Sequence, residues 1–397
     1  MYIKFIIMRF SFVFILLWLA FACQWLRADA PESQKIVNAD ARFDHYLSML
    51  RGRRVGLLVN HTSLVGGRHL CDTLMALGID VRLIFAPEHG FRGTAAAGEH
   101  VGSGTDAATG LPVHSLYGRT RRPTPAQMSE VDVVVFDIQD VGARFYTYIS
   151  TMHYMMEACA EAGVHFMVLD RPNPNGHYVD GPVLRPAFAS FVGMHPIPVV
   201  HGLTVGELAL MINGEGWLRG GGRCRLTVIP VGGYRHSMPV EIGVAPSPNL
   251  PNAQAVRLYP SLCFFEGTHV SVGRGTPFPF QVVGAPGSRF GTFTFTPQSI
   301  AGKAVNPPCC GRLCSGLDLR RADTPACLDL SLLVDFYRLS GGSDAFFADR
   351  RFFDLLAGTD SLRLQIEAGR TAEQIRASWR DELGAYMSLR QKYLIYE

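Results

Sequence analysis

The stretch 131-VDVVVFD-137 decides the fold class, because it is an apolar run of strand length that ends in an acid. Three other runs have the same form: 54-RVGLLVN-60, 81-VRLIFA-86 and 164-VHFMVLD-170. They are continuously apolar rather than alternating, which is typical of strands buried on both faces of a sheet. We therefore predict a parallel sheet in a Rossmann-like α/β domain.

Helical segments separate these strands, as right-handed crossovers between parallel strands require. Residues 68–78 and 147–163 have helical character, and Gly163 is a helix stop. A further helix is expected over 202–216, with Thr204 as its N-cap and an acid three residues later. The alternation of strand and helix supports the α/β prediction.

A second domain is expected after the Pro- and Asn-rich stretch 245–252, which is typical of a linker or long turn. We place a Rossmann-like catalytic domain at 36–250, with a further strand at 225–231, and a smaller α+β domain at 251–397. The elements expected in this second domain are one strand and two helices, at 291–297, 329–339 and 371–393.

Residues 1–30 have the features of a signal peptide: a basic start, a short apolar run and a small-x-small site ending at Ala30. The apolar run is too short for a comfortable membrane span. We expect no stable span in the mature form. A lipid anchor at Cys23 and a retained membrane anchor are the alternatives. The prediction is an exported protein, periplasmic or extracellular.

The net charge and the cysteine content indicate which partners and which cysteine chemistry to expect. The net charge is +3, with no Lys/Arg run of the kind that binds phosphates, so we expect no nucleic-acid partner. Eight cysteines remain after cleavage at Ala30. A disulfide is expected in an exported chain, whereas no paired CxxC spacing supports zinc. The four cysteines that crowd together are Cys309, Cys310, Cys314 and Cys327.

Polar side chains follow the ends of all four predicted strands. The carboxyl ends of parallel strands share one edge, where ligands of open α/β sheets bind. We therefore predict one polar crevice, with turn chemistry as the alternative. The residues expected there are Asn60, His61, Glu88, His89, Arg92, Asp137, Asp140, Arg144, Tyr146, Asp170, Arg171 and Asn173.

Several other chemistries lack their sequence signals. A G-x-G-x-x-A string at 102–107 follows no buried strand, so it does not indicate dinucleotide binding. No P-loop and no G-x-S-x-G elbow occur. A metal-dependent hydrolase using His61, His89 and Asp137 stays an alternative, although no HExxH pair is present. We expect no cofactor and no metal.

Carboxylate acid–base chemistry remains. Glycoside hydrolysis needs an acid near the leaving oxygen and usually a second carboxylate. Glu88, at the mouth of a half-apolar crevice, suits the acid. The second carboxylate stays open among four candidates: Asp137, Asp140, Asp170 and Glu266.

Arginine and tyrosine side chains add possible substrate contacts. Arg92, Arg144 and Arg171 lie just beyond strand ends, and guanidinium forks suit a substrate carboxylate. Pairing with neighbouring acids is the alternative. Tyr146 suits either stacking on a sugar face or packing in the core.

Five motifs, in order along the chain, resemble those of the NamZ-type exo-β-N-acetylmuramidases. The resemblance runs from about Arg54 to Tyr396 and implies a Rossmann-like domain, a smaller C-terminal domain and a site in the cleft between them. The implied activity is release of N-acetylmuramic acid from the non-reducing end of peptidoglycan fragments, so the expected partners are peptidoglycan-derived sugars. The motifs are NHTS (60–63), APEHGFRG (86–93), FDIQDVGARFYTY (136–148), LDRPNPNG (169–176) and FFEGTHVSVGRGT (264–276).

The resemblance carries the family's P-E-H-G glutamate onto Glu88 as the catalytic acid/base. Nine further matched positions are expected to line the cleft, without firm roles. They are His89, Asp137, Asp140, Arg144, Tyr146, Asp170, Arg171, Asn173 and Glu266. Departures at 274–280 and 284–290 are expected to alter the cleft wall more than the chemistry. A protein nucleophile and attack by the substrate acetamide both stay open. A non-catalytic cell-wall sugar binding protein is the remaining alternative.

Overall fold

The computed structural model describes residues 35–92 and 103–397. The signal peptide expected over 1–30, the anchor position Cys23 and Gly102 of the glycine string lie outside these ranges. Residues Val37–Glu397 form one compact unit. Among the described residues, no helix has both the length and the apolar character needed to cross a membrane.

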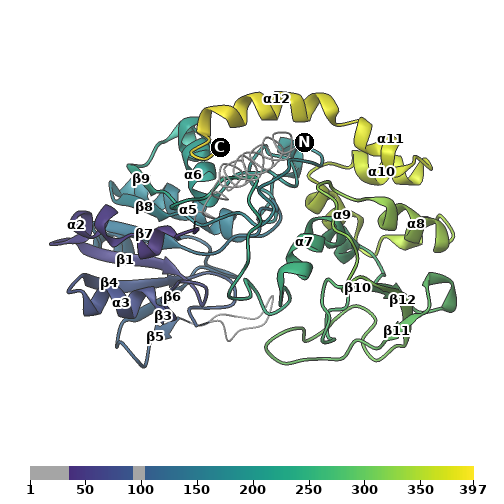
Figure 1. The fold of residues 1–397 in the computed structure, drawn as a ribbon, viewed down its shortest axis with the longest axis horizontal. Helices are drawn as coiled ribbons and strands as arrows, with labels where there is room; N and C mark the ends of the chain where they lie inside the picture. Colours follow the sequence, from purple (N-terminus) through teal and green to yellow (C-terminus); the bar gives the residue numbers. More distant parts are fainter. Residues whose placement is uncertain (1–34, 93–102) are drawn as a thin grey trace, which may run out of the picture. The chain divides into compact units, whose positions relative to one another are not determined.

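A seven-stranded sheet, in the order β5-β6-β4-β1-β7-β8-β9, organises the N-terminal half (Figure 1). All neighbouring strands are parallel except β5 and β6. The parallel sheet predicted from the four apolar runs is confirmed, and the run at 225–231 adds β9. The strands are β1 (Arg54–Val59), β4 (Asp80–Ala86), β5 (Gly104–Thr105), β6 (Pro112–Ser115), β7 (Val133–Asp137), β8 (His165–Leu169) and β9 (Leu226–Ile229).

Both faces of the sheet are covered, which explains why its strands are continuously apolar. Val133 and Val135 of β7 face one core cluster, whereas Val134 and Phe136 face the other. Successive side chains of a strand point to opposite faces, so each face needs its own apolar set. Helices α2 (Leu47–Leu50) and α3 (Leu70–Ala76) cover one face. The other carries α4 (Pro125–Ser129), α5 (Tyr148–Ala162) and α6 (Val205–Gly214).

The helix ends follow the sequence signals in two places and depart from them in one. Helix α5 ends at Gly163, whose φ of 67° is left-handed, and Thr204 caps α6 in a capping box with Glu207. The helix predicted over 68–78 is shorter. Arg68–His69 form β3, paired with β2 (Leu64–Val65), and the His69 side chain caps α3.

The smaller C-terminal domain combines a three-stranded antiparallel sheet, ordered β10-β12-β11, with six α-helices. Its strands are β10 (Val282–Ala285), β11 (Phe293–Phe295) and β12 (Cys314–Asp318). Its helices are α7 (Ala253–Leu262), α8 (Ser331–Leu339), α9 (Arg350–Ala357), α10 (Ser361–Glu367), α11 (Ala372–Ala377) and α12 (Arg380–Arg390). One core cluster contains residues from this domain and from the sheet domain.

The prediction of a single helix over 371–393 is wrong, because the segment forms two helices, α11 and α12, with a non-helical break between them. Trp379 at the break is buried, and its indole Nε1 donates to Asp180 Oδ1 at 3.0 Å. The break between the two helices thus coincides with a contact to a residue distant in sequence, which local helix propensity does not encode.

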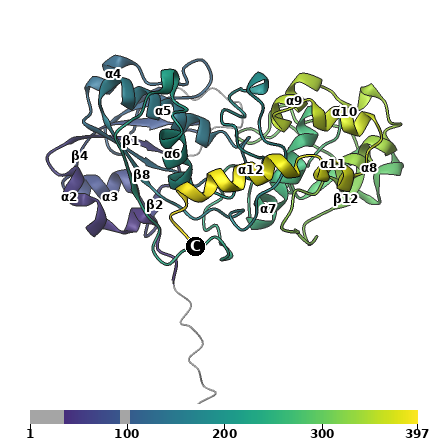
Figure 2. The same ribbon diagram turned by 90° about the horizontal axis from the view of Figure 1, so that it is seen from above.

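Helix α12 leads the chain from α11 back to α6 of the sheet domain (Figures 1 and 2). Beyond it, the Ile395 amide donates to the buried carboxylate of Glu207 at 2.8 Å. Tyr396 Oη donates to Asp170 Oδ2 at 2.7 Å and accepts from the Val231 amide at 2.8 Å. The C-terminal segment thus ties the end of the chain to the sheet.

The disulfide expected among the four crowded cysteines is not formed, because all eight cysteines of the described ranges are free. Cys309 and Cys314 have their thiols in hydrogen-bonding contact. Cys310 is exposed, and Cys327 lies near Asp180. Neighbours in sequence are thus not all neighbours in space.

Candidate active site

A cavity of about 570 Å³ lies between the sheet domain and the C-terminal domain. Cavities of this size bind small ligands. The segments after β4 and β7 and the stretch around Phe191 form one wall, and α9 with residues 247–280 forms the other. The polar side chains in the lining include Glu88, His89, Tyr117, Arg121, Tyr146, Thr147, Ser190, Ser247, Asn249, Tyr259, Glu266 and Arg274.

Glu88 follows β4 after one proline and is half-buried in the cavity wall. Thr147 Oγ1 donates a hydrogen bond to Glu88 Oε2 at 3.2 Å. Thr147 is also the N-cap residue of α5, but its side chain makes no capping bond to the helix. The N-terminus of a helix stabilises a nearby carboxylate. Thr147 and α5 therefore hold Glu88 at the cavity surface.

His89 has a left-handed backbone with a φ of 71°, and Gly90 follows with a φ of 77°. Glycine adopts such values freely, whereas a side chain there is strained. The His89 ring is buried to 95%, with 5% of its surface exposed, and it lines the cavity. Strained residues of this kind concentrate at functional sites. The turn that aims Glu88 into the cavity is thus locally costly.

Glu266 supplies the second carboxylate of the lining, from the 3-10 helix Cys263–Gly267 of the C-terminal domain. Arg274 Nε forms a short ion pair with Glu266 Oε1, and its guanidinium lies over the Phe280 ring. Burial lowers the pKa of Arg274, but the Glu266 carboxylate outweighs this and raises it above the ordinary value. The cavity therefore holds one carboxylate paired with arginine and one, Glu88, hydrogen-bonded to a hydroxyl.

Tyr146 forms part of the cavity floor. Its hydroxyl donates to the Pro246 carbonyl at 2.8 Å, and its ring meets Tyr148 and Tyr259 edge to face. Burial raises its pKa well above the ordinary value, so the hydroxyl stays protonated. Tyr146 therefore connects the turn before α5 to the 245–252 segment.

Two lining arginines, Arg121 and Arg274, were missed by the sequence analysis. Arg121 Cζ lies 4.3 Å from the centroid of the Phe191 ring. It belongs to the basic segment RTRR (119–122), which follows no strand of the predicted sheet. Arg274 lies between two glycines in GRG, a motif too short to interpret alone. Arg121 has no local signal that links it to the site, whereas Arg274 lies within the motif at 264–276 but had no role assigned to it.

Asp137 lies in a buried ion cluster away from the lining residues. Arg171 Nε and Nη2 contact its two oxygens at 2.6 and 3.0 Å, and Nη2 also contacts Asp40 Oδ2 at 2.7 Å. Two carboxylates share one guanidinium. Burial, followed by the Asp137 charge, raises the pKa of Asp40 to about 7. Arg171 thus pairs with neighbouring acids, the alternative considered for it.

Asn60 and Asp140 satisfy the backbone of tight turns. Asn60 Oδ1 accepts from the Thr62 amide and hydroxyl at 2.9 and 2.7 Å. Asp140 Oδ2 accepts from the Gly142 amide at 2.6 Å, and burial raises the pKa of Asp140 to about 7. These are turn interactions at the ends of β1 and β7.

Arg144 is fully buried and binds only backbone carbonyls among the described residues. Its Nη1 donates to Pro182 and Ile197, each at 2.8 Å. Its Nη2 donates to Leu356 and Ala357 of α9, at 3.0 and 2.6 Å. Burial lowers its pKa to about 9. Arg144 therefore joins the sheet domain to the C-terminal domain behind the cavity wall.

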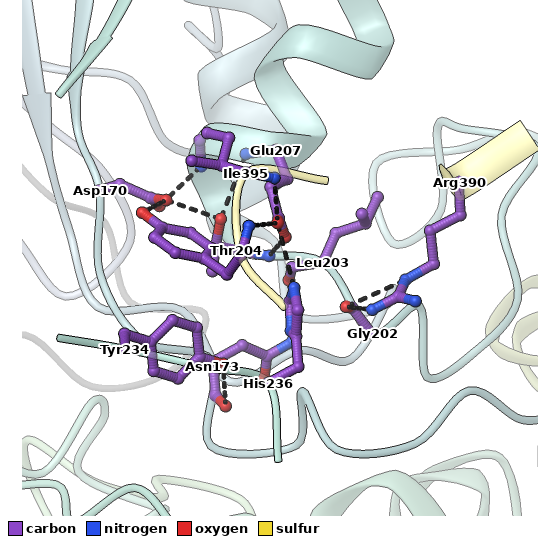
Figure 3. Close-up of polar contacts among 12 residues, drawn as sticks. Asp170, Asn173, Gly202, Leu203, Thr204, Glu207, Tyr234, His236, Arg390 and Ile395 are labelled. Carbon is purple, nitrogen blue, oxygen red and sulfur yellow. Dashed lines mark hydrogen bonds and ion pairs between the residues drawn. The ribbon is translucent and has the colours of Figure 1, made fainter. Parts of the chain in front are cut away.

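Asp170 and Asn173 also hold the fold together, as Figure 3 shows. Asp170 accepts from Thr204 Oγ1 at 2.7 Å and from the Gly206 amide at 2.8 Å. Asn173 Nδ2 donates to the Leu203 carbonyl at 2.8 Å. These bonds fix the loop that leads into α6.

Arg92 and His61 have structural partners as well. Arg92 forms a two-pronged ion pair with Asp106, at 2.8 Å for each contact. His61 Nε2 lies 2.8 Å from the Ala245 carbonyl oxygen. Within residues 35–92 and 103–397, no three His, Cys, Asp or Glu side chains converge in a way that suits a metal ion.

The residues that line the cavity therefore differ from those predicted to line the crevice. Four of the expected residues line the cavity: Glu88, His89, Tyr146 and Glu266. The structure places the other nine outside the lining, in turns, ion pairs and interdomain contacts. They are Asn60, His61, Arg92, Asp137, Asp140, Arg144, Asp170, Arg171 and Asn173.

Solved structures show the same architecture. A crystal structure of a DUF1343 family protein from Bacteroides fragilis matches with a TM-score of 0.84 and 44% identity, covering 91% of this chain and 99% of that one. A second structure of a DUF1343 family protein from the same organism matches with a TM-score of 0.81 and 31% identity, covering 92% and 100%.

Sequence comparison gives the family. The peptidoglycan β-N-acetylmuramidase NamZ of Bacillus subtilis is 39% identical over 385 residues, covering 90% of each chain. The family description "Exo-beta-N-acetylmuramidase NamZ, N-terminal" matches residues 55–254, and its C-terminal counterpart matches residues 257–396. The chain therefore belongs to the NamZ exo-β-N-acetylmuramidase family.

Proposed function

We propose that this protein is an exo-acting glycoside hydrolase that releases N-acetylmuramic acid from the non-reducing end of peptidoglycan fragments. Glu88 is its general acid/base. The observation that carries the proposal is the half-buried carboxylate of Glu88, held by Thr147 at the N-terminus of α5 and facing a sugar-sized cavity. Membership of the NamZ family supports the substrate class.

Glu266 has a different role in this proposal. A carboxylate whose oxygen is engaged by Arg274 is a weaker nucleophile, because the guanidinium stabilises its negative charge. We assign Glu266 to stabilising the positive charge that develops on the sugar ring and to orienting the 2-acetamido group. Asp137 and Asp140, the other predicted catalytic carboxylates, then have structural roles: Asp137 in the ion cluster with Arg171 and Asp140 in the turn after β7.

The test of Glu88 is hydrolysis of a chromogenic β-N-acetylmuramide. Glu88→Gln preserves the shape and the hydrogen bond from Thr147 but cannot transfer a proton, so we expect kcat to fall by about 10²-fold or more. Glu161→Gln, a change at an exposed carboxylate paired with Arg122, is the matched control. Full release by Glu88→Gln, or no release by the wild type, contradicts the proposal.

Export is part of the proposal, because peptidoglycan lies outside the cytoplasm. The signal-peptide features of residues 1–30 support it. Fractionation of expressing cells and N-terminal sequencing test this point, with Pro31 expected as the first residue of the exported form. A cytoplasmic protein that retains residues 1–30 contradicts it.

A further inference from the structure

A second cavity, of about 530 Å³, adjoins the candidate active site on the side of the C-terminal domain. Glu266 lines both cavities, so the two meet at this residue. The rest of its wall comes from residues 268–270, the segment after β10, the segment before β12 and the loop between α8 and α9. A substrate that extends beyond the first cavity past Glu266 enters this second one.

The charge of the second cavity is positive. Its lining includes the exposed side chains of His269, Arg289 and Arg312. Glu266 is the one carboxylate among its lining residues, and Arg274 already pairs with it. Within the described part of the chain, no ion pair engages Arg289 or Arg312. Their guanidinium donors therefore face the cavity without a protein carboxylate to bind.

Two largely buried aromatic rings accompany these cations. Phe290 and Phe346 contribute to the lining, and the Arg289 guanidinium lies 4.9 Å from the Phe290 ring centroid. Stacking on a ring orients a guanidinium while leaving its N–H groups for a ligand. Both rings are buried, with 5% of Phe290 and 3% of Phe346 exposed, so the guanidinium rather than a ring face meets the ligand. The oriented guanidinium suits a carboxylate.

Peptidoglycan supplies this chemistry at a defined position. N-acetylmuramic acid and N-acetylglucosamine alternate along the glycan, so a terminal muramic acid is followed by a glucosamine and then by another muramic acid. When the terminal sugar occupies the first cavity, the next carboxylate lies on the leaving side of the bond. It belongs to the lactyl group or, in peptide-bearing glycan, to the attached peptide.

We propose that the second cavity is an anion-binding subsite for the leaving side of the glycan, in which Arg289 and Arg312 bind a carboxylate. This inference rests on the proposed function, since it assumes that the terminal sugar occupies the first cavity. It makes the enzyme prefer glycans of at least three sugars over a disaccharide. The preference arises from charge and therefore weakens as salt rises.

The experiment compares three peptide-free substrates that carry a terminal muramic acid. They are a disaccharide, a tetrasaccharide, and the same tetrasaccharide with its inner carboxylate reduced to an alcohol. For the wild type we expect kcat/KM on the tetrasaccharide to exceed that on its reduced form by about tenfold, as a charged hydrogen-bond pair contributes. The Arg289→Gln/Arg312→Gln double variant should lose this advantage and keep wild-type activity on the disaccharide.

Arg321→Gln is the matched control, because Arg321 is an exposed arginine of the same domain outside the cavity lining. A tetrasaccharide with a peptide on its inner muramic acid separates the two carboxylate sources. A lower kcat/KM of the double variant on the peptide-free or the peptide-bearing tetrasaccharide supports the subsite. The proposal is overturned if kcat/KM is equal on the tetrasaccharide and its reduced form and does not change when the inner muramic acid carries a peptide. Absence of turnover on every substrate, including the disaccharide, would instead contradict the proposed function.

Discussion

At the scale of single residues, the two arginines of the first cavity differ in what lies beside them. Arg274 is committed to Glu266. Arg121 stacks on Phe191 and forms no ion pair within the described ranges. A stacked guanidinium keeps its fork of N–H donors for a planar anion. We therefore predict that Arg121 recognises the substrate carboxylate, a role considered for Arg92, Arg144 and Arg171 from the sequence.

Replacing Arg121 should weaken the enzyme's action on a muramide without changing its action on a glucosaminide. We expect Arg121→Gln to raise KM for a chromogenic muramide by about tenfold and to leave hydrolysis of the matching glucosaminide, which lacks the lactyl carboxylate, unchanged. Arg119→Gln, at an exposed position outside the cavity lining, is the control. Equal losses on both sugars would assign Arg121 a structural role.

Asp140 should make stability depend on pH. Burial raises the pKa of Asp140 from 3.8 to about 7 in the folded protein. The folded state then holds this proton more tightly than the unfolded state. Its contribution to stability is complete below about pH 4 and is lost as the pH rises to about 7. Asp140→Asn removes this titration and keeps an oxygen to accept from the Gly142 amide.

The measurement is urea unfolding of both proteins from pH 4 to pH 8 (approximate bounds set by the two pKa values). We expect the variant to gain a few kcal/mol relative to the wild type across this interval. Asp318→Asn is the control, because Arg320 lowers the pKa of Asp318 and this carboxyl stays ionised throughout the interval. The stability difference between Asp318→Asn and the wild type should therefore not change with pH there. A difference between wild type and Asp140→Asn that stays constant with pH would contradict the prediction.

At the scale of elements, the segment after α12 stabilises the sheet domain by contacts distant in sequence. Tyr396 Oη lies between the Val231 amide and the Asp170 carboxylate, both buried. Asp170 in turn binds Thr204, the N-cap of α6. The start of α6 and the end of the chain are therefore parts of one hydrogen-bond network (Figure 3).

Removing one hydroxyl tests this network. Tyr396→Phe leaves the buried Val231 amide without its acceptor and removes one of the two hydroxyl donors to Asp170 Oδ2, which keeps Thr204. We therefore expect the free energy of unfolding to fall by about 2 kcal/mol. Tyr393→Phe is the control, because its hydroxyl binds Glu215 near the surface and should contribute less than about 0.5 kcal/mol. The readout is urea unfolding at neutral pH, and similar losses for both variants would argue against the network.

At the scale of the whole molecule, Arg144 couples the two domains whose facing surfaces form the first cavity. One buried guanidinium binds carbonyls of the sheet domain and of α9 together. Leu355 and Leu356 of α9 line the cavity. The position of one cavity wall therefore depends on a residue outside the lining.

Arg144→Lys tests this coupling. A lysine ammonium is compact and lacks the fork needed to reach four carbonyls, so we expect a loss of about 3 kcal/mol in unfolding free energy. We also expect kcat on a muramide to fall in the molecules that remain folded. Arg185→Lys, at an exposed arginine near Glu382, should change neither quantity. A stable Arg144→Lys protein with normal kcat would show that the domains are held by other contacts.

Local pattern was enough to predict much of this molecule. Continuous apolar runs such as 131–137 indicate strands buried on both faces, and the capping box at Thr204 marks the start of α6. These features depend on residues a few positions apart. A strand buried on both faces needs apolar side chains, and a capped helix needs a capping side chain, wherever the segment lies in the fold. The position of Glu88, directly after a parallel strand, follows from the same logic.

Tertiary packing alone decided the membership of the cavity. Polar residues at the ends of strands look alike in sequence whether they face a ligand, close a turn or join domains. Their partners lie far away along the chain: Arg171 reaches Asp40, Arg144 reaches α9, and Asp170 reaches Tyr396. A buried polar group must find a partner, and which partner it finds depends on distances that only the folded chain sets. For this reason the place of Glu88 at the end of a strand was predictable from its own surroundings, whereas the place of Arg121 in the lining and the pairing of Glu266 with Arg274 were not.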